Sequence, residues 1–445
     1  MKSARYLREL YGGLPREIYA LFVAQAINSL GHFVYPFLTL LLTQQGGYTA
    51  SEAGRYILLA SSSFIPGSLL GGRISDRFGR KRLLVTAMSA GAVIFIVPGY
   101  LERPEALPWF MMAAEFCMGM VDPTITALAT DVTIPENRKS AFSLLYLGHN
   151  LGFVAGPIIA GYLFTRNYNL LFFGDAATTL VAVILIALLV GESRPEESEI
   201  RAIGEQRPME AKDLGSGLRV ILRRPALLVF MVGVLLIEFV YAQFTFTLPL
   251  HLQELFGDRG AGFFGTIMTI NALVVVLATA PLIAVTRKMR PVATVAMGTA
   301  LYILGFGLLF FTGRFYFVIL MSIIWTFGEI LTATNIDVFI ANHTPASHRG
   351  RVNAIAPILF GLGYAISPAL MGSYIDRFSP ARAWPLVASV AAVATAVLTL
   401  LALQESRHPK GPSPTSFDAS GIPEGRPTDQ VNDPAMTVCA PPRGR

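Results

Sequence analysis

Charged residues are scarce in this chain, and their scarcity decides the class of protein. They make up 14% of the 445 residues, whereas soluble domains carry about 25%. Apolar residues make up 53%, and apolar runs of about 20 residues recur along the whole length, each long enough to cross a hydrocarbon core of about 30 Å. The runs lack the alternation of barrel strands, so we predict an all-helical integral membrane protein.

Cysteine and the signatures of common enzymes are also nearly absent. The two cysteines, Cys117 and Cys439, are far apart in the sequence, and no spacing of ligand residues suits a metal site. The chain has no G-x-x-x-x-G-K-[ST] loop for ATP and no clustered nucleophile and base. We therefore expect no metal, no bound cofactor and no enzymatic reaction.

The apolar runs fall into two groups of six. We predict spanning helices at 17–43, 51–75, 80–101, 107–130, 139–165, 169–191, 225–256, 260–286, 291–311, 314–342, 349–377 and 383–405. The first run is too long for a secretory signal peptide, so it should remain as the first helix. The predicted organisation is a six-helix half over 1–191, a cytoplasmic linker over 192–224, a second six-helix half over 225–405 and a disordered cytoplasmic tail over 406–445.

Basic residues test this topology. With both termini in the cytoplasm, most of the 35 Lys and Arg residues fall in cytoplasmic segments, as the positive-inside rule requires. Removing or adding one helix would scramble this alternation, so twelve spans are favoured. The net charge of +6 then reflects topology and does not indicate nucleic-acid binding. We expect a multi-pass protein of a prokaryotic inner membrane, and a monomer.

The two halves show internal similarity. The segment 138–161 aligns without a gap on 349–372, which suggests parallel repeats around a central site near the membrane midplane. The matching pairs are Arg138 and Arg349, Gly152 and Gly363, Pro157 and Pro368, and Gly161 and Gly372. The alternative is chance similarity between two glycine-rich packing helices.

The loop after the second run carries a patterned set of glycines and charges. Residues 71–81 read G-G-R-I-S-D-R-F-G-R-K, and the pattern consists of Gly72, Asp76, Arg77, Gly79 and Arg80. Glycine permits a close helix approach at Gly72 and a tight turn at Gly79. A run of bases that merely obeys the positive-inside rule would not explain Asp76 with its glycines.

This loop resembles the G-x-x-x-D-R-x-G-R-[KR] motif of the major facilitator superfamily. The resemblance implies twelve helices in two bundles, with Asp76 facing the N-terminus of the eleventh helix. It also implies that Arg80 pairs with an acid at the inner end of the fourth helix, where Asp131 fits. Such contacts would act as a latch while the inner side is closed. The eighth helix is followed by no comparable acid, so we expect gating to rest mainly on the first half.

The fifth predicted helix carries a second glycine motif. It consists of Gly148, Gly152, Gly156, Pro157 and Gly161. Steps of four residues place the first three glycines on one face, where helix backbones can touch. The motif resembles G-x-x-x-G-P-x-x-G-G of the antiporter branches, with Ala160 in place of one glycine. Ordinary tight packing is the alternative interpretation.

Three further stretches narrow the resemblance. Residues 131–139, 243–252 and 328–330 are similar to the lactococcal-type proton/multidrug antiporters. That resemblance implies that Glu329, near the middle of the tenth helix, couples protons to drug binding. A carboxyl group inside a membrane is costly and favours its neutral form, so it can exchange a proton for a lipophilic cation. A structural hydrogen bond to a neighbouring helix is the alternative.

The seventh helix departs from those exporters. They carry an acid at the position of Thr245, and this chain has Glu238 seven residues earlier. In a continuous helix this is two turns away on the same face, so we hypothesise that Glu238 takes over the role of that acid.

Other polar residues inside the predicted spans are candidates for the same pathway. Glu115 and Asp122 share a face of the fourth helix and are further candidates for proton or substrate coupling. Possible cavity-lining residues, for which interhelical hydrogen bonds are the alternative, are Asn28, His32, His149, Asn150, Gln243 and Asn271.

These features together predict a secondary transporter driven by the proton gradient. The leading prediction is export of amphipathic, mainly cationic drugs, with the lipid bilayer, protons and a small amphipathic substrate as partners. A lipid or glycolipid flippase and a proton-coupled metabolite transporter of the same fold are the alternatives. The antiporter-type glycines, and the lack of an intramembrane base for an anionic substrate, argue against symport.

Overall fold

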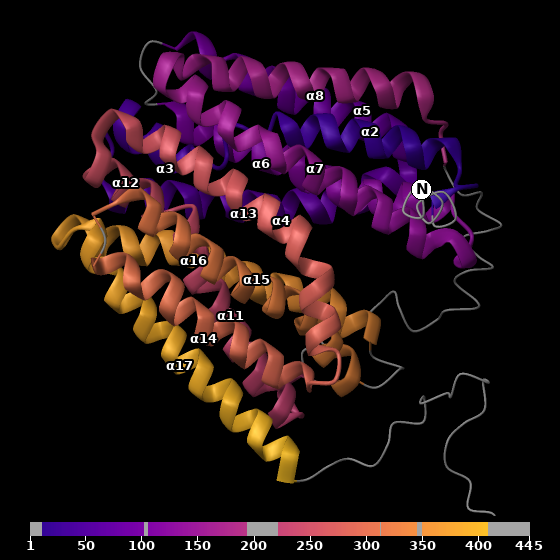
Figure 1. The fold of residues 1–445 in the computed structure, drawn as a ribbon. Coiled ribbons are helices and arrows are strands. Elements are labelled where there is room, and N and C mark those ends of the chain that lie inside the picture. The colour runs from indigo at the N-terminus through magenta and orange to yellow at the C-terminus, as the bar shows by residue number, and fades with distance from the viewer. Residues whose placement is uncertain (1–10, 102–105, 194–220, 312, 345–348, 408–445) are drawn as a thin grey trace, which may run out of the picture. The chain divides into compact units, whose positions relative to one another are not determined.

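The computed structural model is all-helical in the residues that it describes, which are 11–101, 106–193, 221–311, 313–344 and 349–407 (Figure 1). Contacts divide the chain into a unit over Met1–Ala402 and a second over Leu403–Arg445. All contacts described below lie within the first. Most of the predicted linker and tail, including Cys439, lies outside the described residues.

The described residues of the first half contain nine helical elements. They are α2 (Arg16–Leu30), α3 (Leu38–Leu40), the π-helix η1 (Leu41–Gln45), α4 (Ala50–Phe78), α5 (Arg80–Ile96), η2 (Pro98–Tyr100), α6 (Leu107–Asp131), α7 (Pro135–Asn167) and α8 (Asn169–Leu189). The second half contains α11 (Pro225–Tyr241), η4 (Ala242–Phe244), α12 (Thr247–Phe256), η5 (Gly257–Arg259), α13 (Gly260–Thr286), α14 (Pro291–Gly307), η6 (Leu308–Phe311), α15 (Phe315–His343), α16 (Arg349–Arg377) and α17 (Pro380–Arg407).

Nine helical stretches in the described residues are long and apolar enough to cross a membrane. One of them, Pro225–Thr286, covers two of the predicted spans. The predicted spans 17–43 and 107–130 correspond to α2–η1 and α6, which are outside these nine. The carboxylates of Glu115 and Asp122 lower the mean hydropathy of α6. The count of twelve therefore stays a prediction.

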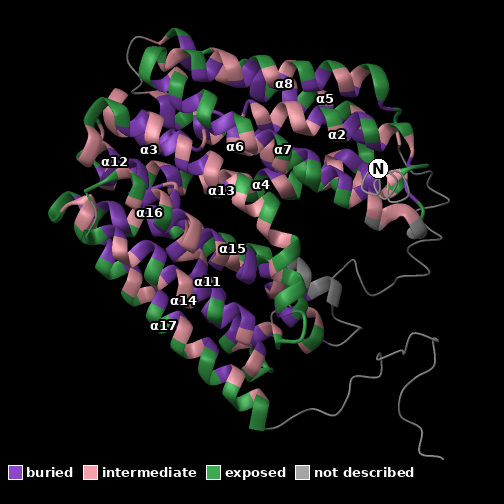
Figure 2. Ribbon diagram, in the orientation of Figure 1, coloured by how far each residue is buried: buried purple, intermediate pink, exposed green. Residues whose placement is uncertain are grey.

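Exposed apolar side chains show how the helices meet their surroundings. Exposed residues are spread along the helices and are not confined to the connections (Figure 2). Among them are Leu188, Leu277 and Leu400, with 66% or more of their surface exposed. An apolar surface of this kind is unusual on a soluble protein and suits contact with lipid. The chain is a multi-pass membrane protein.

The first predicted helix is interrupted, which corrects the expected continuous span 17–43. α2 ends at Leu30, and helical structure resumes at Leu38. Pro36 explains the break because it lacks an N–H and its ring would clash with the His32 carbonyl one turn earlier. The freed backbone finds a partner on α8, where Asp175 Oδ2 accepts a hydrogen bond from the Val34 N–H at 3.3 Å.

The seventh predicted helix is also interrupted, so Glu238 and Thr245 are not two turns apart on one regular face. α11 ends at Tyr241, and α12 begins at Thr247. Pro249 would clash with the Thr245 carbonyl in a continuous helix and cannot donate to it. That carbonyl instead accepts a hydrogen bond from the Thr39 hydroxyl at 3.0 Å, so the two interrupted segments meet across the halves.

The two halves pack closely at one end. We call it the outer end because its connections carry few of the basic residues. These connections lie near residues 45–50, 167–169, 256–260 and 377–380. In Figure 1, α3 and α12 are labelled near this end. There α4 meets α16 and α7 meets α13. A Cβ added at Gly54 would lie 2.1 Å from the Pro368 carbonyl oxygen, and one added at Gly265 would lie 2.3 Å from that of Pro157. Only glycine permits these approaches.

Candidate functional site

A polar cluster in the second half is built around Glu329 on α15. Glu329 Oε2 accepts a hydrogen bond from Asn271 Nδ2 on α13 at 2.7 Å. The same Asn271 amide donates to the Thr326 hydroxyl at 2.9 Å, which fixes its orientation. Asn271 therefore holds the coupling candidate directly, instead of lining an open cavity.

Side chains from two more helices surround this carboxyl group. Tyr241 on α11 and Tyr302 on α14 interact electrostatically with Glu329, and their rings stack with centroids 6.2 Å apart. Glu238 on α11 is a further electrostatic neighbour of Glu329. The described membrane-spanning helices carry no Lys or Arg in their interior that would pair with these two acids. The acids thus share a half-buried, aromatic environment without a fixed counter-charge.

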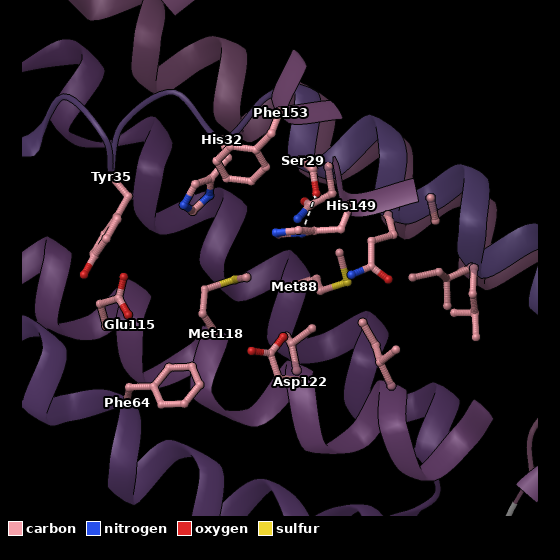
Figure 3. Close-up of a pocket in the computed structure, with 17 residues that line it drawn as sticks. Ser29, His32, Tyr35, Phe64, Met88, Glu115, Met118, Asp122, His149 and Phe153 are labelled. Carbon is pink, nitrogen blue, oxygen red and sulfur yellow. Dashed lines mark hydrogen bonds between the residues drawn. The ribbon is translucent and has the colours of Figure 1, made fainter. Parts of the chain in front are cut away.

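A second polar site is a partly open cavity of about 250 Å³ lined by residues of the first half (Figure 3). α6 contributes Glu115 and Asp122, and the opposite wall contributes His32 and His149. The His149 Nδ1 atom is 3.1 Å from the Ser29 hydroxyl. His32 lies just after α2 and continues the face of Leu21, Gln25 and Asn28 that lines the cavity. Two acids and two imidazoles therefore share one apolar-walled space.

The remaining cavity candidates are distributed differently. Asn28 lines the cavity, and its Oδ1 accepts a hydrogen bond from Thr179 at 3.0 Å. Asn150 does not line it, and its amide donates to the Tyr146 carbonyl of the same helix at 2.8 Å. Gln243 has no exposed surface, and its side chain forms hydrogen bonds with Ser367 and Thr247. Its role is therefore to stabilise the break between α11 and α12.

Tyr364 on α16 links the two polar sites. Its hydroxyl is 2.7 Å from the Thr245 hydroxyl, and its electrostatic neighbours include Glu238 of its own half and Glu115 of the other half. The sequence did not point to Tyr364, because nothing near it in the sequence distinguishes it from other tyrosines in apolar helices. Tyr241 carried a signal that could have been used, since it lies one turn after Glu238.

The loop motif forms a compact network at the inner end of the first half. The Arg80 side chain, 8% exposed, makes an ion pair with Asp76 and another with Asp131, whose Oδ2 is 3.1 Å from Arg80 Nε. Gly79 has a φ of +104°, which its turn requires. Among the described residues, no hydrogen bond or ion pair joins Asp76 or Arg77 to α16. Asp131 also accepts from Ser193 at 3.3 Å.

The role expected for Gly72 is wrong in this structure. A Cβ added there would meet nothing within 4 Å, whereas one added at Gly71 would lie 2.6 Å from Met120 Cα on α6. The close approach of α4 and α6 therefore depends on the preceding glycine. The motif spacing placed the turn glycine correctly and could not show which of two adjacent glycines faces the neighbouring helix.

The glycine motif of α7 serves two interfaces. Gly148, Gly152 and Gly156 lie against α2, where an added Cβ would come within 2.5–2.7 Å of backbone atoms of Phe22, Ala26 and Leu30. Pro157 and Gly161 lie against α13 of the other half. The motif therefore joins a contact within one half to a contact between halves.

α16 repeats this arrangement with the matching residues. A Cβ added at Gly363 would lie 2.4 Å from the Leu235 carbonyl on α11, within its own half. Pro368 and Gly372 instead approach α4 of the other half. Helices α7 and α16 thus make equivalent contacts, which supports a common origin over chance similarity.

Asp131→Asn should destabilise the protein more than Asp76→Asn. Arg80 and Asp131 are mostly buried, with side-chain exposures of 8% and 22%, whereas Asp76 is 66% exposed. Weakening a hydrogen bond to a buried charge costs about 1.5–3 kcal/mol, and an exposed ion pair contributes about 0–1 kcal/mol. Thermal unfolding in detergent measures the difference, and equal shifts for the two variants would contradict the assigned network.

Comparison with known proteins identifies the family. A sequence model of the Major Facilitator Superfamily matches residues 21–368, and a second match covers 258–435. The chain belongs to the Major Facilitator Superfamily. As a member it is a secondary transporter and not an enzyme, and the membrane helices described above form the fold of that superfamily.

Several proteins are similar to this transporter. It is 26% identical over 356 residues to the uncharacterized MFS-type transporter YqjV of Bacillus subtilis (strain 168), covering 78% of this chain and 83% of that protein. It is 25% identical over 371 residues to a Na(+), Li(+), K(+)/H(+) antiporter of Planococcus maritimus, covering 77% and 85%. A stretch of 174 residues is 33% identical to the multidrug resistance protein MdtH of Salmonella typhimurium (strain LT2), covering 38% and 42%.

Solved structures show the same fold. The nucleoside transporter NupG superposes with a TM-score of 0.71 at 12% identity, covering 86% of this chain and 98% of that chain. At this identity the likeness shows the fold alone. The narrower resemblance to lactococcal-type exporters stays a prediction.

Proposed function

We propose that this transporter exports amphipathic, mainly cationic compounds in exchange for protons across a prokaryotic inner membrane. The observation that carries the proposal is the Glu238–Glu329 pair, two intramembrane acids that interact with each other. In the part of the chain that the structure describes, no intramembrane base lies beside them. Unpaired acids inside a membrane mark ion or substrate pathways. A proton or a substrate cation can neutralise such a pair.

The surroundings of Glu329 suit an exchange of this kind. Asn271 donates a hydrogen bond to the carboxyl group in either protonation state, so the side chain stays in place when the proton leaves. The partly buried Tyr241 ring can attract an organic cation, and the buried Tyr302 ring supports it from behind. Competition of a proton and a substrate cation for one carboxylate would couple their movements in opposite directions.

The acids of the first half extend the same chemistry. Glu115 and Asp122 line the cavity of Figure 3 with aromatic side chains such as Phe153. Tyr364 is an electrostatic neighbour of both Glu115 and Glu238, so the cavity and the Glu329 cluster approach one another. We assign the cavity to the apolar body of the substrate and the Glu238–Glu329 pair to the exchange of its charge for protons, with Glu115 on the cavity side of Tyr364.

Glu238 is proposed to replace the acid that related exporters carry at the position of Thr245. The regular two-turn spacing does not exist, because the helix is interrupted between the two residues. A different link supports the hypothesis: the Tyr364 hydroxyl contacts Thr245 and is an electrostatic neighbour of Glu238. The displaced carboxyl group therefore still acts on the same polar path.

Exchange of alkali cations for protons is the second candidate, supported by the similarity to the Planococcus maritimus antiporter. A small metal cation prefers several oxygen ligands held together. In the described residues no three His, Cys, Asp or Glu side chains gather in a way that could hold a metal ion. A lipid flippase or a metabolite transporter remains the third candidate, and the absence of a base beside the described acids disfavours anionic substrates.

Inverted membrane vesicles with a preformed pH gradient test the proposal. The probes are ethidium as a lipophilic cation, NaCl and KCl, a neutral nucleoside and a dipeptide. We expect ethidium to dissipate the gradient in vesicles that contain the transporter and not in vesicles that lack it. A response to sodium or potassium alone would replace the proposal with alkali-cation antiport. A response to the nucleoside or dipeptide alone would replace it with metabolite transport.

A further inference from the structure

The start of α4 has its free backbone donors satisfied in an unusual way. The first four N–H groups of a helix have no partner within it. Thr49 and Glu52 form a capping box that satisfies two of them, with bonds of 2.9 and 3.2 Å. The other two, from Ala50 and Ser51, donate to the two oxygens of Asp376 at 2.9 Å each. Asp376 belongs to α16, in the opposite half of the transporter.

Asp376 is therefore a helix cap supplied across the interface between the halves. A carboxylate at a helix N-terminus gains both from charge-assisted hydrogen bonds and from the positive end of the helix dipole. The surrounding contacts hold it there: Ser373 Oγ is 3.1 Å from Ser51 Oγ, and a Cβ added at Gly372 would lie 2.2 Å from the Ala50 carbonyl oxygen. In this structure the outer end is closed and the cap is formed.

The sequence around Asp376 repeats part of the inner-end motif. Residues 72–78 read G-R-I-S-D-R-F, and residues 372–378 read G-S-Y-I-D-R-F. In both segments the arginine lies over the ring of the following phenylalanine, at 5.8 and 5.6 Å. Each segment ends a long helix, α4 and α16 respectively. The G-x-x-x-D-R-F pattern therefore occurs at the C-terminal ends of two neighbouring helices, once at the inner end and once at the outer end of the protein.

We propose that Asp376 is an outer-end latch residue, the counterpart of Asp76 at the inner end. α4 runs from the outer to the inner end and α16 runs back, so the terminal acid of each helix lies on the same side as the start of the other. Asp376 caps α4 when the outer end is closed and releases it when that end opens. This inference depends on alternating access and is independent of the proposed substrate and of proton coupling.

Distance measurements between spin labels test the latch. The labels are placed at Arg166→Cys on α7 and Asp258→Cys on η5, both exposed and on opposite sides of the outer seam. The background carries Cys117→Ala and Cys439→Ala. We expect Asp376→Ala to raise the ratio of long to short distances about fivefold, the size of a lost helix cap. Asp376→Asn should raise it less, because its one amide oxygen can still accept one of the two hydrogen bonds. Both variants must elute as monodisperse protein for the ratio to be read.

A matched control removes a charge from the same helix start without crossing the interface. Glu52→Gln alters the capping box within α4 and should leave the ratio unchanged, because it affects open and closed states alike. Adding Asp76→Asn to Asp376→Asn should move the ratio back toward wild type, since the opposing latch is then weakened too. The proposal is overturned if Asp376→Ala changes the ratio no more than Glu52→Gln does. It is also overturned if the double variant moves the ratio further from wild type.

Discussion

Glu329→Gln is expected to reduce substrate-dependent proton release in inverted vesicles to less than about a tenth of the wild-type rate. Glutamine keeps the size of the side chain and can still accept the Asn271 hydrogen bond, which is 2.7 Å long in the wild type. It cannot bind and release a proton at working pH. The expected variant is a folded protein that has lost coupling, because its hydrogen-bond network survives and its titratable group does not.

The control for this variant lies on the same helix. Asp337 is an exposed acid of α15 outside the polar cluster, and Asp337→Asn should retain the wild-type rate. Glu238→Gln belongs in the same series, because its neighbour Glu329 would then titrate alone. Proton release that persists in both glutamine variants would remove the carboxylate mechanism. A normal rate in Glu238→Gln alone would remove only the hypothesis that this acid replaces the one missing at Thr245.

Gly152→Ala is expected to destabilise the transporter by about 1–3 kcal/mol, the usual cost of an extra methyl group in a tightly packed interface. The new Cβ would lie 2.5 Å from both the Ala26 carbonyl oxygen and the Leu30 amide nitrogen. These are backbone atoms of α2, so no side-chain rotation can relieve the clash. The two helices would have to separate along the face where Gly148 and Gly156 also touch α2.

Gly361→Ala provides the same chemical change without the clash. Gly361 lies on α16, and a Cβ added there would meet nothing within 4 Å. Alanine is a better helix former than glycine by about 1 kcal/mol, so this variant should be neutral or slightly more stable. Thermal unfolding of both variants in the same detergent measures the contrast. Similar melting shifts would show that the motif glycines reflect composition and have no specific packing role.

The extent of the helices followed closely from the sequence, and their interruptions did not. Predicted span 80–101 corresponds to α5 and η2, and span 291–311 corresponds to α14 and η6. Hydropathy indicates which segments lie in lipid, and a broken apolar helix is as hydrophobic as a continuous one. Pro36 and Pro249 signalled both breaks, but prolines also occur within the continuous helices α4, α6 and α7. Whether a proline bends or breaks a membrane helix depends on partners for the freed carbonyl.

The polar site was only partly visible in the sequence. Acids inside apolar runs stand out because their burial is costly, so Glu238 and Glu329 could be named at once. The partners of Glu329, which are Asn271, Tyr241 and Tyr302, come from three other helices. Polar or aromatic residues of these types are common in membrane proteins. For Gln243 the sequence suggested a functional role that the structure does not support. It was expected to line a cavity, and it instead stabilises a break in the backbone.

The sequence by itself determined the properties that depend on local composition. Apolar run length and the placement of bases indicate a membrane protein with a defined topology, and the spacing of glycines and charges indicates the family. Only the tertiary structure decided which helix ends meet. The cap of Asp376 on Ala50 and Ser51 joins residues in opposite halves of the chain. Hydrogen bonds of this kind depend on three-dimensional proximity, and no local pattern of residues specifies it.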